Sequence, residues 1–240
     1  MTFPCATRST PADLTSDEVH VWTLGLDDLS PPDDATLDAT ERTRAGRFHF
    51  EKDRRRFIHC RSFMRRVLAG YLDRAPSAVP LVVGDHGKPG LATNIPLAFN
   101  LTHCTSAALL AVTRRNRIGI DAEGRATLDD LLGMIGLIFT AEEAAWVLTL
   151  PEDERQILFL RGWTRKEAVL KLSGEGLTIP PDRIIVPFEQ DGPWRGSIPS
   201  GLAWGGTAFD LIDISTGPLI AALAVAATET PPVIRHFRAD

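Results

Sequence analysis

The 240-residue sequence contains few cysteines and no long hydrophobic run. Its three cysteines, Cys5, Cys60 and Cys104, are an odd and scattered set, which argues against a disulfide framework and favours reduced thiols. No stretch reaches the roughly 18 consecutive apolar residues that a membrane span needs. The first residues also lack the apolar centre of a signal peptide. These absences predict a cytoplasmic protein without a membrane partner.

Charge is unevenly distributed along the chain, although the formal net charge is only -5. Residues 41–66 contain nine arginines and Lys52 against three acidic residues, a local net charge of +7. Apolar residues recur in this segment at helical spacing, which predicts an amphipathic helix with a basic outer face. Such a face suits phosphate groups or an acidic partner protein, or is simply a solvated surface. Because the whole chain is acidic, nucleic acid is the less favoured partner.

Residues 161–177, RGWTRKEAVLKLSGEGL, place Trp163, Glu167 and Lys171 at intervals of four residues. Side chains at this spacing share one face of a helix. Gly174 provides the left-handed conformation that commonly ends a helix. Taken alone, a Glu–Lys pair on a helix is an ordinary surface contact. It becomes a candidate catalytic pair if other polar residues converge on it.

Carboxylates that could converge on this pair follow an apolar run at 117–124, RIGIDAEG. Asp121 and Glu123 are two residues apart, so on a strand both point the same way and repel each other. A hard cation such as magnesium would relieve that repulsion. The segment FTAEEAAWV adds Glu142 or Glu143; the register favours Glu143, which also matches a capping box begun by Thr140.

Two further segments carry groups suited to an anion. The segment FNLTH at 99–103 ends in His103, which suits a phosphate or is a satisfied structural residue. In HGKPGL at 86–91, the glycines and the proline predict a turn that holds Lys88 near rigid backbone. Cys104 follows His103 directly and would point to the opposite face of a strand, which argues against a thiol nucleophile.

The order of elements predicts an α+β protein with two similar halves, residues 1–115 and 116–240, divided near 114–116. Two internal similarities support a duplication. RSFMRRVLAGYL at 61–72 is similar to RGWTRKEAVLKL at 161–172, and AALLAVT at 107–113 is similar to AALAVAAT at 221–228. Loops are expected at 191–206 and 228–233. Strands are expected near 19–24, 80–84, 97–102, 107–113, 117–122, 183–188, 208–214 and 219–227, and helices near 35–49, 54–73, 127–137, 141–149 and 152–173.

The blocks GKP, FNLTH, IGIDAE and W-x-x-KEA-x-x-K followed by GEGL, in this order, resemble the 4′-phosphopantetheinyl transferases. The resemblance is to the larger two-half group that includes the surfactin-synthetase-activating enzyme, and it covers about residues 40–190. It implies two pseudo-symmetric halves, each a small antiparallel sheet packed with a long helix, with coenzyme A in the cleft between them. The implied activity, of the holo-[acyl-carrier-protein] synthase type, transfers 4′-phosphopantetheine to a serine of an acyl or peptidyl carrier protein and releases 3′,5′-ADP.

The resemblance also implies a role for the helical pair and the carboxylates. Glu167 matches the general base, which acts on the serine directly or through water. Lys171 matches a lysine that contacts the pyrophosphate of coenzyme A or protonates the leaving group. The implied magnesium ligands are Asp121, Glu123 and Glu143. Lys166 belongs to the same motif and is expected among the residues that bind coenzyme A, although the sequence alone does not explain a specific role for it.

The remaining matches lie near the phosphates of coenzyme A. Lys88 and His103 match residues beside the 3′-phosphate, and Thr102 keeps the hydroxyl of the serine that is frequent there. One of two basic positions that hold this phosphate falls on Arg44, but the other falls on Glu41. The resemblance therefore implies a rearranged phosphate site in this chain.

Two other functions are compatible with the same residues. A metal-dependent nuclease also uses paired carboxylates, but such sites usually carry a lysine where Gly124 and Arg125 follow Glu123 here. An inactive protein that only binds coenzyme A or a carrier would not need Glu167, Lys171 and three acidic residues together. A monomer is expected, because two internal halves already form a cleft.

Overall fold

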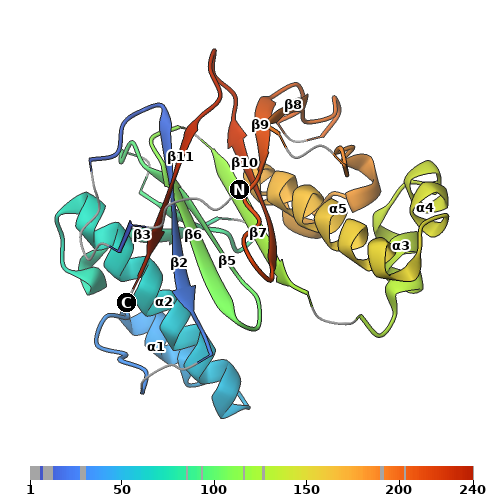
Figure 1. The fold of residues 1–240 in the computed structure, drawn as a ribbon. Helices are drawn as coiled ribbons and strands as arrows, with labels where there is room; N and C mark the ends of the chain where they lie inside the picture. The colour runs from blue at the N-terminus through green and yellow to red at the C-terminus, as the bar shows by residue number, and fades with distance from the viewer. Residues whose placement is uncertain are drawn as a thin grey trace.

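The fold consists of two lobes that lie side by side, each with a sheet and a long helix (Figure 1). The structure is a computed structural model, and it describes residues 6–7, 13–27, 31–84, 86–92, 94–115, 117–125, 128–189, 192–202 and 204–239. Cys5 and Asn116 lie outside these residues, whereas Cys60 and Cys104 are buried and free. No helix in the described ranges is long and apolar enough to cross a membrane.

The first lobe is built on a five-stranded sheet with the order β1-β11-β2-β6-β5. Strand β11 pairs parallel with both β1 and β2, and the other pairs are antiparallel. A separate hairpin, β3–β4, and helices α1 and α2 complete this lobe. The bounds are β1 Ala6–Thr7, β2 Glu18–Gly25, α1 Ala39–Ala45, α2 Glu51–Leu72, β3 Leu81–Val83, β4 Pro89–Leu91, β5 Ala98–His103, β6 Ala107–Thr113 and β11 Val233–Arg238.

The second lobe is built on a four-stranded antiparallel sheet with the order β7-β10-β9-β8. Its three helices follow β7 directly in the chain. The bounds are β7 Ile118–Gly124, α3 Leu131–Ile138, α4 Ala141–Leu148, α5 Glu152–Ser173, β8 Trp194–Ser197, β9 Ala208–Asp213 and β10 Leu219–Ala226. Strands β2, β6 and β5 therefore have the same order as β7, β10 and β9.

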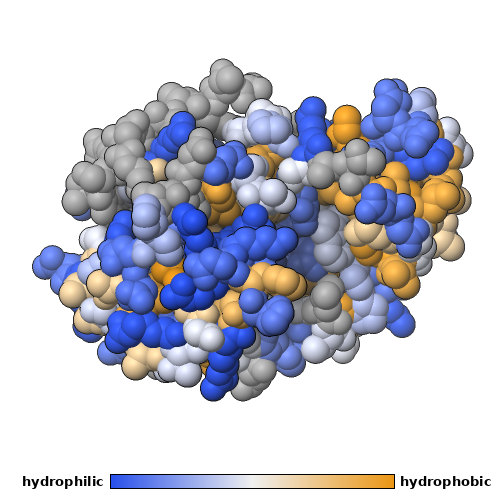
Figure 2. Space-filling model, turned by 90° about the horizontal axis from the view of Figure 1, so that it is seen from below, coloured by the Kyte–Doolittle hydropathy of each residue, from blue (hydrophilic) through white to orange (hydrophobic). Residues whose placement is uncertain are grey.

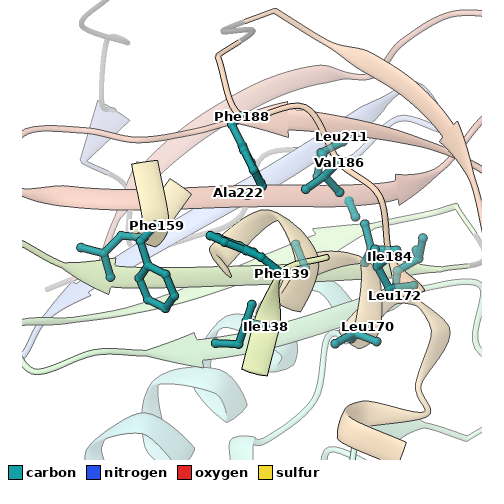
Figure 3. Close-up of a cluster of buried hydrophobic side chains, with 14 of the residues drawn as sticks. Ile138, Phe139, Phe159, Leu170, Leu172, Ile184, Val186, Phe188, Leu211 and Ala222 are labelled. Carbon is teal, nitrogen blue, oxygen red and sulfur yellow. The ribbon is translucent and has the colours of Figure 1, made fainter. Parts of the chain in front are cut away.

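Three apolar clusters account for the packing of these layers. One lies between α2 and the first sheet and includes Phe63, Leu68 and Leu110. Another lies between α5 and the second sheet, where the rings of Phe139, Phe159 and Phe188 meet (Figure 3). The third contains only strand and loop residues of the two lobes, so the sheets bury their remaining faces against each other. Burial on both faces explains why β6 and β10 are almost entirely apolar.

The predicted α+β fold with two similar halves is confirmed. The similar segments at 61–72 and 161–172 form the last turns of α2 and α5, and those at 107–113 and 221–228 include β6 and β10. Helix α5 has the predicted bounds, whereas α1 is shorter than the helix expected at 35–49. Helix α3 begins at Leu131, later than expected.

The strand predicted near 183–188 is wrong. Ile184, Val186 and Phe188 alternate with more exposed residues, as in a strand, and point into the second cluster (Figure 3). The segment nevertheless pairs with no strand of the described structure. Pro187 has no N–H to donate to a neighbouring strand. The period of two here reflects one-sided packing of an extended segment.

Four strands of the described structure were not predicted. Strand β1 lies where no strand was expected, and β4 lies within 86–91, which was expected to be a turn. Strand β8 lies within 191–206, which was expected to be a loop. Strand β11 follows the loop at 228–232 and pairs with β2 of the first lobe, although the predicted division assigns residues 116–240 to the second half. The division at residue 115 stays a prediction, and the last described strand pairs with the first sheet.

Candidate functional site

Strand β7 and helix α5 approach each other unusually closely at Gly119. A Cβ atom on Gly119 would lie 2.0 Å from the carbonyl oxygen of Ala168 and 2.4 Å from the backbone nitrogen of Leu172. Asp121 and Glu123 lie on the same face of β7 as Gly119, because side chains alternate along a strand. The absence of a side chain at Gly119 therefore brings these two carboxylates directly against the last turns of α5.

Lys171 of α5 and Asp121 of β7 form an ion pair at the junction of the two lobes. The Lys171 ammonium nitrogen lies 2.6 Å from Oδ1 of Asp121 and 3.2 Å from the hydroxyl oxygen of Thr102, which belongs to β5 of the first lobe. The Thr102 hydroxyl also donates to Oδ1 of Asp121 over 3.0 Å. Asp121 is only 5% exposed. Its second oxygen, Oδ2, is buried and has no hydrogen-bond partner among the described residues.

Glu123 and Glu167 share the electrostatic environment of this ion pair. Burial and the nearby charge of Asp121 raise the pKa of Glu123, against a hydrogen bond from the Trp163 indole and the charge of Lys171. Burial also raises the pKa of Glu167, and Asp121 and Glu123 add to that rise, while Lys171 opposes it. A raised carboxylate pKa is what a general base that works near neutral pH requires.

Glu143 contacts residues outside the cluster formed by Asp121, Lys171 and their neighbours. Its side chain accepts from the backbone N–H of Thr140 over 2.9 Å, and its own N–H donates to the Thr140 hydroxyl over 3.1 Å, so it forms the capping box at the start of α4. Its Oε2 also lies 2.7 Å from the ammonium nitrogen of Lys166, a residue with no exposed surface. Glu142 is exposed on the same helix. The role of Glu143 as a metal ligand remains a prediction.

The contacts of Lys166 explain a motif residue that the sequence left without a role. Its ammonium group donates to Glu143 and, over 3.2 Å, to the carbonyl oxygen of Pro181, and it lies 5.3 Å from the centre of the Phe139 ring. Burial lowers the pKa of Lys166, and the Glu143 carboxylate opposes this effect. Lys166 thus links α5 to the start of α4 and to the segment that follows α5, which contains Pro181.

The predicted phosphate contacts are only partly assembled. His103 lies at the end of β5, where partial burial and the positive charges of Arg56 and Lys171 lower the pKa of its imidazole. Arg44 is exposed on α1, with its guanidinium 5.2 Å from the centre of the Phe57 ring. The ammonium group of Lys88 instead donates to two main-chain carbonyls, those of Ile118 and Lys171.

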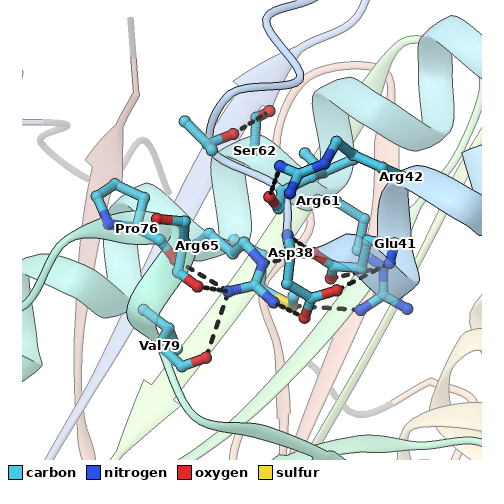
Figure 4. A network of polar contacts seen from close by, with 12 residues as sticks. Asp38, Glu41, Arg42, Arg61, Ser62, Arg65, Pro76 and Val79 are labelled. Atoms are coloured by element: carbon cyan, nitrogen blue, oxygen red, sulfur yellow. Dashed lines mark hydrogen bonds and ion pairs between the residues drawn. The ribbon is translucent and has the colours of Figure 1, made fainter.

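Glu41, which stands at a position expected to be basic, belongs to a buried ion-pair network (Figure 4). Its carboxylate accepts from Arg65, which has no exposed surface, and lies 3.7 Å from Arg61. Asp38 also pairs with Arg65, and the carbonyl oxygens of Pro76, Ser77 and Val79 accept from the same guanidinium. Glu41 is therefore engaged with the interior of the first lobe.

Magnesium suits this site through two carboxylates. In the described ranges, no three His, Cys, Asp or Glu side chains converge closely enough to hold an ion by themselves. Magnesium is, however, usually held by one or two carboxylates together with substrate phosphates. The unpartnered Oδ2 of Asp121 and the mutual repulsion of Asp121 and Glu123 are what such an ion would satisfy. Figure 2 shows a hollow in the surface between the two lobes, with hydrophilic residues along part of its rim.

The division of the site between the two lobes agrees with two sequence models of one protein family. Residues 34–115 match the 4′-phosphopantetheinyl transferase N-terminal model, and residues 117–211 match the 4′-phosphopantetheinyl transferase superfamily model. A protein named 4′-phosphopantetheinyl transferase HetI, from Nostoc sp., is 39% identical over 179 residues, which are 70% of this chain and 74% of that protein. The chain belongs to the 4′-phosphopantetheinyl transferase superfamily.

Other relatives carry the same activity in their names. A 4′-phosphopantetheinyl transferase of Bacillus subtilis is 26% identical over 70% of this chain and 73% of its own length. The 4′-phosphopantetheinyl transferase AcpT of Salmonella typhimurium is 33% identical over 43% of this chain and 54% of its own length. Membership of this superfamily supports a transferase activity for the chain.

Three residues that shape this candidate site were not singled out in the sequence. Gly119 permits the contact of β7 with α5, and Asn100 accepts a hydrogen bond from the backbone N–H of Ile120 over 2.8 Å. Arg56 adds positive charge beside His103. Gly119 and Asn100 both lie inside the motif blocks, so their presence there was a signal, whereas Arg56 is one of many arginines in its segment.

Proposed function

We propose that the chain transfers the 4′-phosphopantetheine arm of coenzyme A to a serine hydroxyl of an acyl or peptidyl carrier protein and releases 3′,5′-ADP. The observation that carries this proposal is the convergence of Glu167, Lys171, Asp121 and Glu123 beside Thr102 of the other lobe. Such a site offers a base, a cation and two metal-binding carboxylates where the two lobes meet. Phosphoryl-type transfer needs these groups.

Glu167 is the proposed general base. The raised pKa of its carboxyl group favours acceptance of a proton from the serine hydroxyl, directly or through one water molecule. The positive charge of Lys171 opposes that rise and keeps the carboxylate ionised over a wider range of pH. Glu167 therefore needs Lys171 as its neighbour as well as its burial.

Asp121 and Glu123 would hold magnesium, which when bound neutralises charge on the coenzyme A pyrophosphate. Glu143 binds Lys166 through Oε2 only, and its Oε1 is buried without a hydrogen-bond partner among the described residues, so it could add a third ligand oxygen. Because no three such side chains converge in the described ranges, we propose the two carboxylates of β7 together with phosphate oxygens as the main ligand set. Lys171, fixed by Asp121 and Thr102, would contact the pyrophosphate and donate a proton to the departing 3′,5′-ADP. His103, Arg44 and Arg56 would attract the 3′-phosphate.

The direct test is incubation with coenzyme A, magnesium and a panel of apo carrier domains, followed by intact mass measurement. A carrier that is a substrate gains about 340 Da, the mass that the formula of phosphopantetheine adds. Glu167→Gln should keep coenzyme A binding, measured by calorimetry, while kcat falls about 10²- to 10⁴-fold, because the amide cannot accept the proton.

Glu154→Gln provides a matched control, because Glu154 is exposed in the first turn of the same helix. It should transfer at the rate of the unmodified protein. A rate for Glu167→Gln equal to that of the control would remove Glu167 as the base. Nucleic acid cleavage by the same preparation, with no mass gain on any carrier, would replace the proposal with a metal-dependent nuclease.

A further inference from the structure

The turn between β3 and β4 presents Lys88 of the first lobe to the second lobe. The backbone N–H of Gly84 donates to the carbonyl of Lys88, and that of Gly87 donates to the carbonyl of Gly84, both over 2.9 Å. Gly87 has a φ of +80°, a conformation that favours glycine. The backbone on both sides of Lys88 is thereby fixed, and its side chain extends to the junction of β7 and α5.

The ammonium group of Lys88 joins the two elements that carry the site. It donates to the carbonyl oxygen of Ile118 in β7 over 2.9 Å and to the carbonyl oxygen of Lys171 in the last turn of α5. The last four carbonyls of a helix have no partner within the helix. A cation at this end also opposes the negative end of the helix dipole. Lys88 therefore satisfies an otherwise open carbonyl of the residue that binds Asp121.

Asn100 makes a second contact on the edge of β7 that Lys88 reaches at Ile118. Strand β7 lies at the edge of its sheet, so one row of its backbone groups has no neighbouring strand. The C=O of residue 118 and the N–H of residue 120 point to the same side of a strand. Asn100 accepts from the N–H of Ile120, and Lys88 donates to the C=O of Ile118. Two side chains of the first lobe thus complete this edge.

Two other contacts lie near the end of α5, one at Ser173 and one beyond it at Glu175. Arg117 donates to the carbonyl of Ser173 over 3.0 Å, and His86, in the same turn as Lys88, lies 3.1 Å from the Glu175 carboxylate. Burial, together with the positive charges of Arg117 and Lys171, lowers the pKa of Lys88 to about 8. The direct contacts of its ammonium group are the two carbonyl oxygens of the second lobe.

We propose that Lys88 is a positioning residue, which holds the last turn of α5 against β7 and so keeps Lys171 on Asp121, and that it does not bind the 3′-phosphate of coenzyme A. This inference rests on the proposed function for its kinetic consequences only. The contacts that it explains are those of the protein without substrate. The proposal leaves the 3′-phosphate of coenzyme A to His103, Arg44 and Arg56. It also makes the first lobe part of the support of helix α5.

The kinetic test compares Lys88→Met with the unmodified protein on coenzyme A and on 3′-dephospho-coenzyme A. We expect kcat to fall about 10-fold or more, because small displacements of catalytic groups are costly, while KM for coenzyme A changes less than about 3-fold. The loss should be the same on both substrates. His103→Gln is the contrasting variant, since its defect should largely disappear when the 3′-phosphate is absent. A Lys88→Met defect that also disappears on 3′-dephospho-coenzyme A would overturn the proposal.

A second measurement does not depend on activity. Hydrogen exchange in Lys88→Met without substrate should be about 10-fold faster than in the unmodified protein over the last turn of α5, residues 170–174, because this turn has lost its contact with β7. His86→Gln is the matched control from the same turn, and its exposed pair should leave exchange there unchanged. Lys88→Arg, which keeps a cationic donor, should restore slow exchange. Equal exchange in Lys88→Met and the unmodified protein would contradict the proposal, whether or not any carrier is a substrate.

Discussion

The two lobes share a scaffold but differ in what their long helices carry. Helices α2 and α5 each have 22 residues and pack on the sheet of their own lobe. In the aligned segments at 61–72 and 161–172, Val67 and Tyr71 correspond to Glu167 and Lys171. Val67 is buried in the apolar cluster, and the Tyr71 hydroxyl bonds to His20 and Trp22. The scaffold is therefore common to both lobes, and the two residues proposed to act in the reaction replace a valine and a tyrosine of the first lobe.

The same alignment also shows a buried arginine that the two long helices have in common. Arg65 and Arg165 occupy corresponding positions, and both are almost completely buried. Each pairs with a carboxylate and donates to carbonyls of a segment that follows its helix: Arg65 with Glu41 and Pro76, and Arg165 with Asp213 and Pro187. A buried guanidinium that ties helix to loop is thus a shared structural device.

Removal of Arg65 should give the largest effect on stability, and removal of Arg165 a smaller one. Arg65→Met leaves Asp38 and Glu41 without their main partner, so we expect a loss of about 3–5 kcal/mol in the free energy of unfolding. Arg165→Met should cost about 2 kcal/mol, because Asp213 still lies 3.8 Å from Arg161. Denaturant unfolding measures both. Equal losses of unfolding free energy in the two variants would show that the two buried arginines contribute equally to stability.

The close contact of β7 with α5 should make the second lobe intolerant of a single methyl group. Gly119→Ala places Cβ against backbone atoms of α5, which cannot move as a side chain does, so we expect a loss of about 3 kcal/mol and weak transfer. Gly124→Ala in the same strand has no atom within 4 Å of the added Cβ and should change stability by less than about 0.5 kcal/mol. Thermal unfolding of the two variants would decide whether the contact is as tight as described.

Substitutions at the corresponding positions 71 and 171 should separate stability from activity. Tyr71→Phe removes hydrogen bonds to His20 and Trp22, at 2.6 and 2.9 Å, and should cost about 1–2 kcal/mol of stability without changing kcat. Lys171→Met should instead lower kcat about 10²-fold, because it removes the cation beside the pyrophosphate. Loss of transfer in Tyr71→Phe would mean that the first lobe takes a direct part in the reaction.

The smallest effect concerns acid stability at the seam between β2 and β11. Burial alone would raise the pKa of Glu18, but hydrogen bonds from Arg235 and Thr15 lower it to about 2. A carboxyl group with a lowered pKa contributes stability above its unfolded pKa, and this contribution is lost as the pH falls from about 4.5 towards 2. We expect Glu18→Gln to lack about 1 kcal/mol of this pH-dependent stability, since Arg235 is more than half exposed. Unfolding curves at pH 6 and pH 3 would show an unchanged pH dependence if the pair contributes nothing.

The sequence predicted those helices and strands whose bounds depend on the residues within them. The bounds of α5 and β6 follow from periodicity, and the site residues of β7 and α5 follow from motif order. The partner of a charged side chain was not predictable in the same way. Glu143 and Lys88 are both polar residues inside motif blocks, but their contacts with Lys166 and with two carbonyls depend on packing between distant elements. Strand β11 exists through its pairing with β2, which no local pattern near Val233 reveals.

The position of β11 also has a consequence for the order of folding. Of the described strands, β11 is the last to be translated, and it occupies the edge of β2, a strand whose Val19 and Val21 are fully buried. Until it arrives, β2 presents an unpaired row of backbone groups, a template for pairing with another chain. The first lobe, although translated first, can therefore close its sheet only after the second lobe has been made, and nascent chains are most vulnerable to association during that interval.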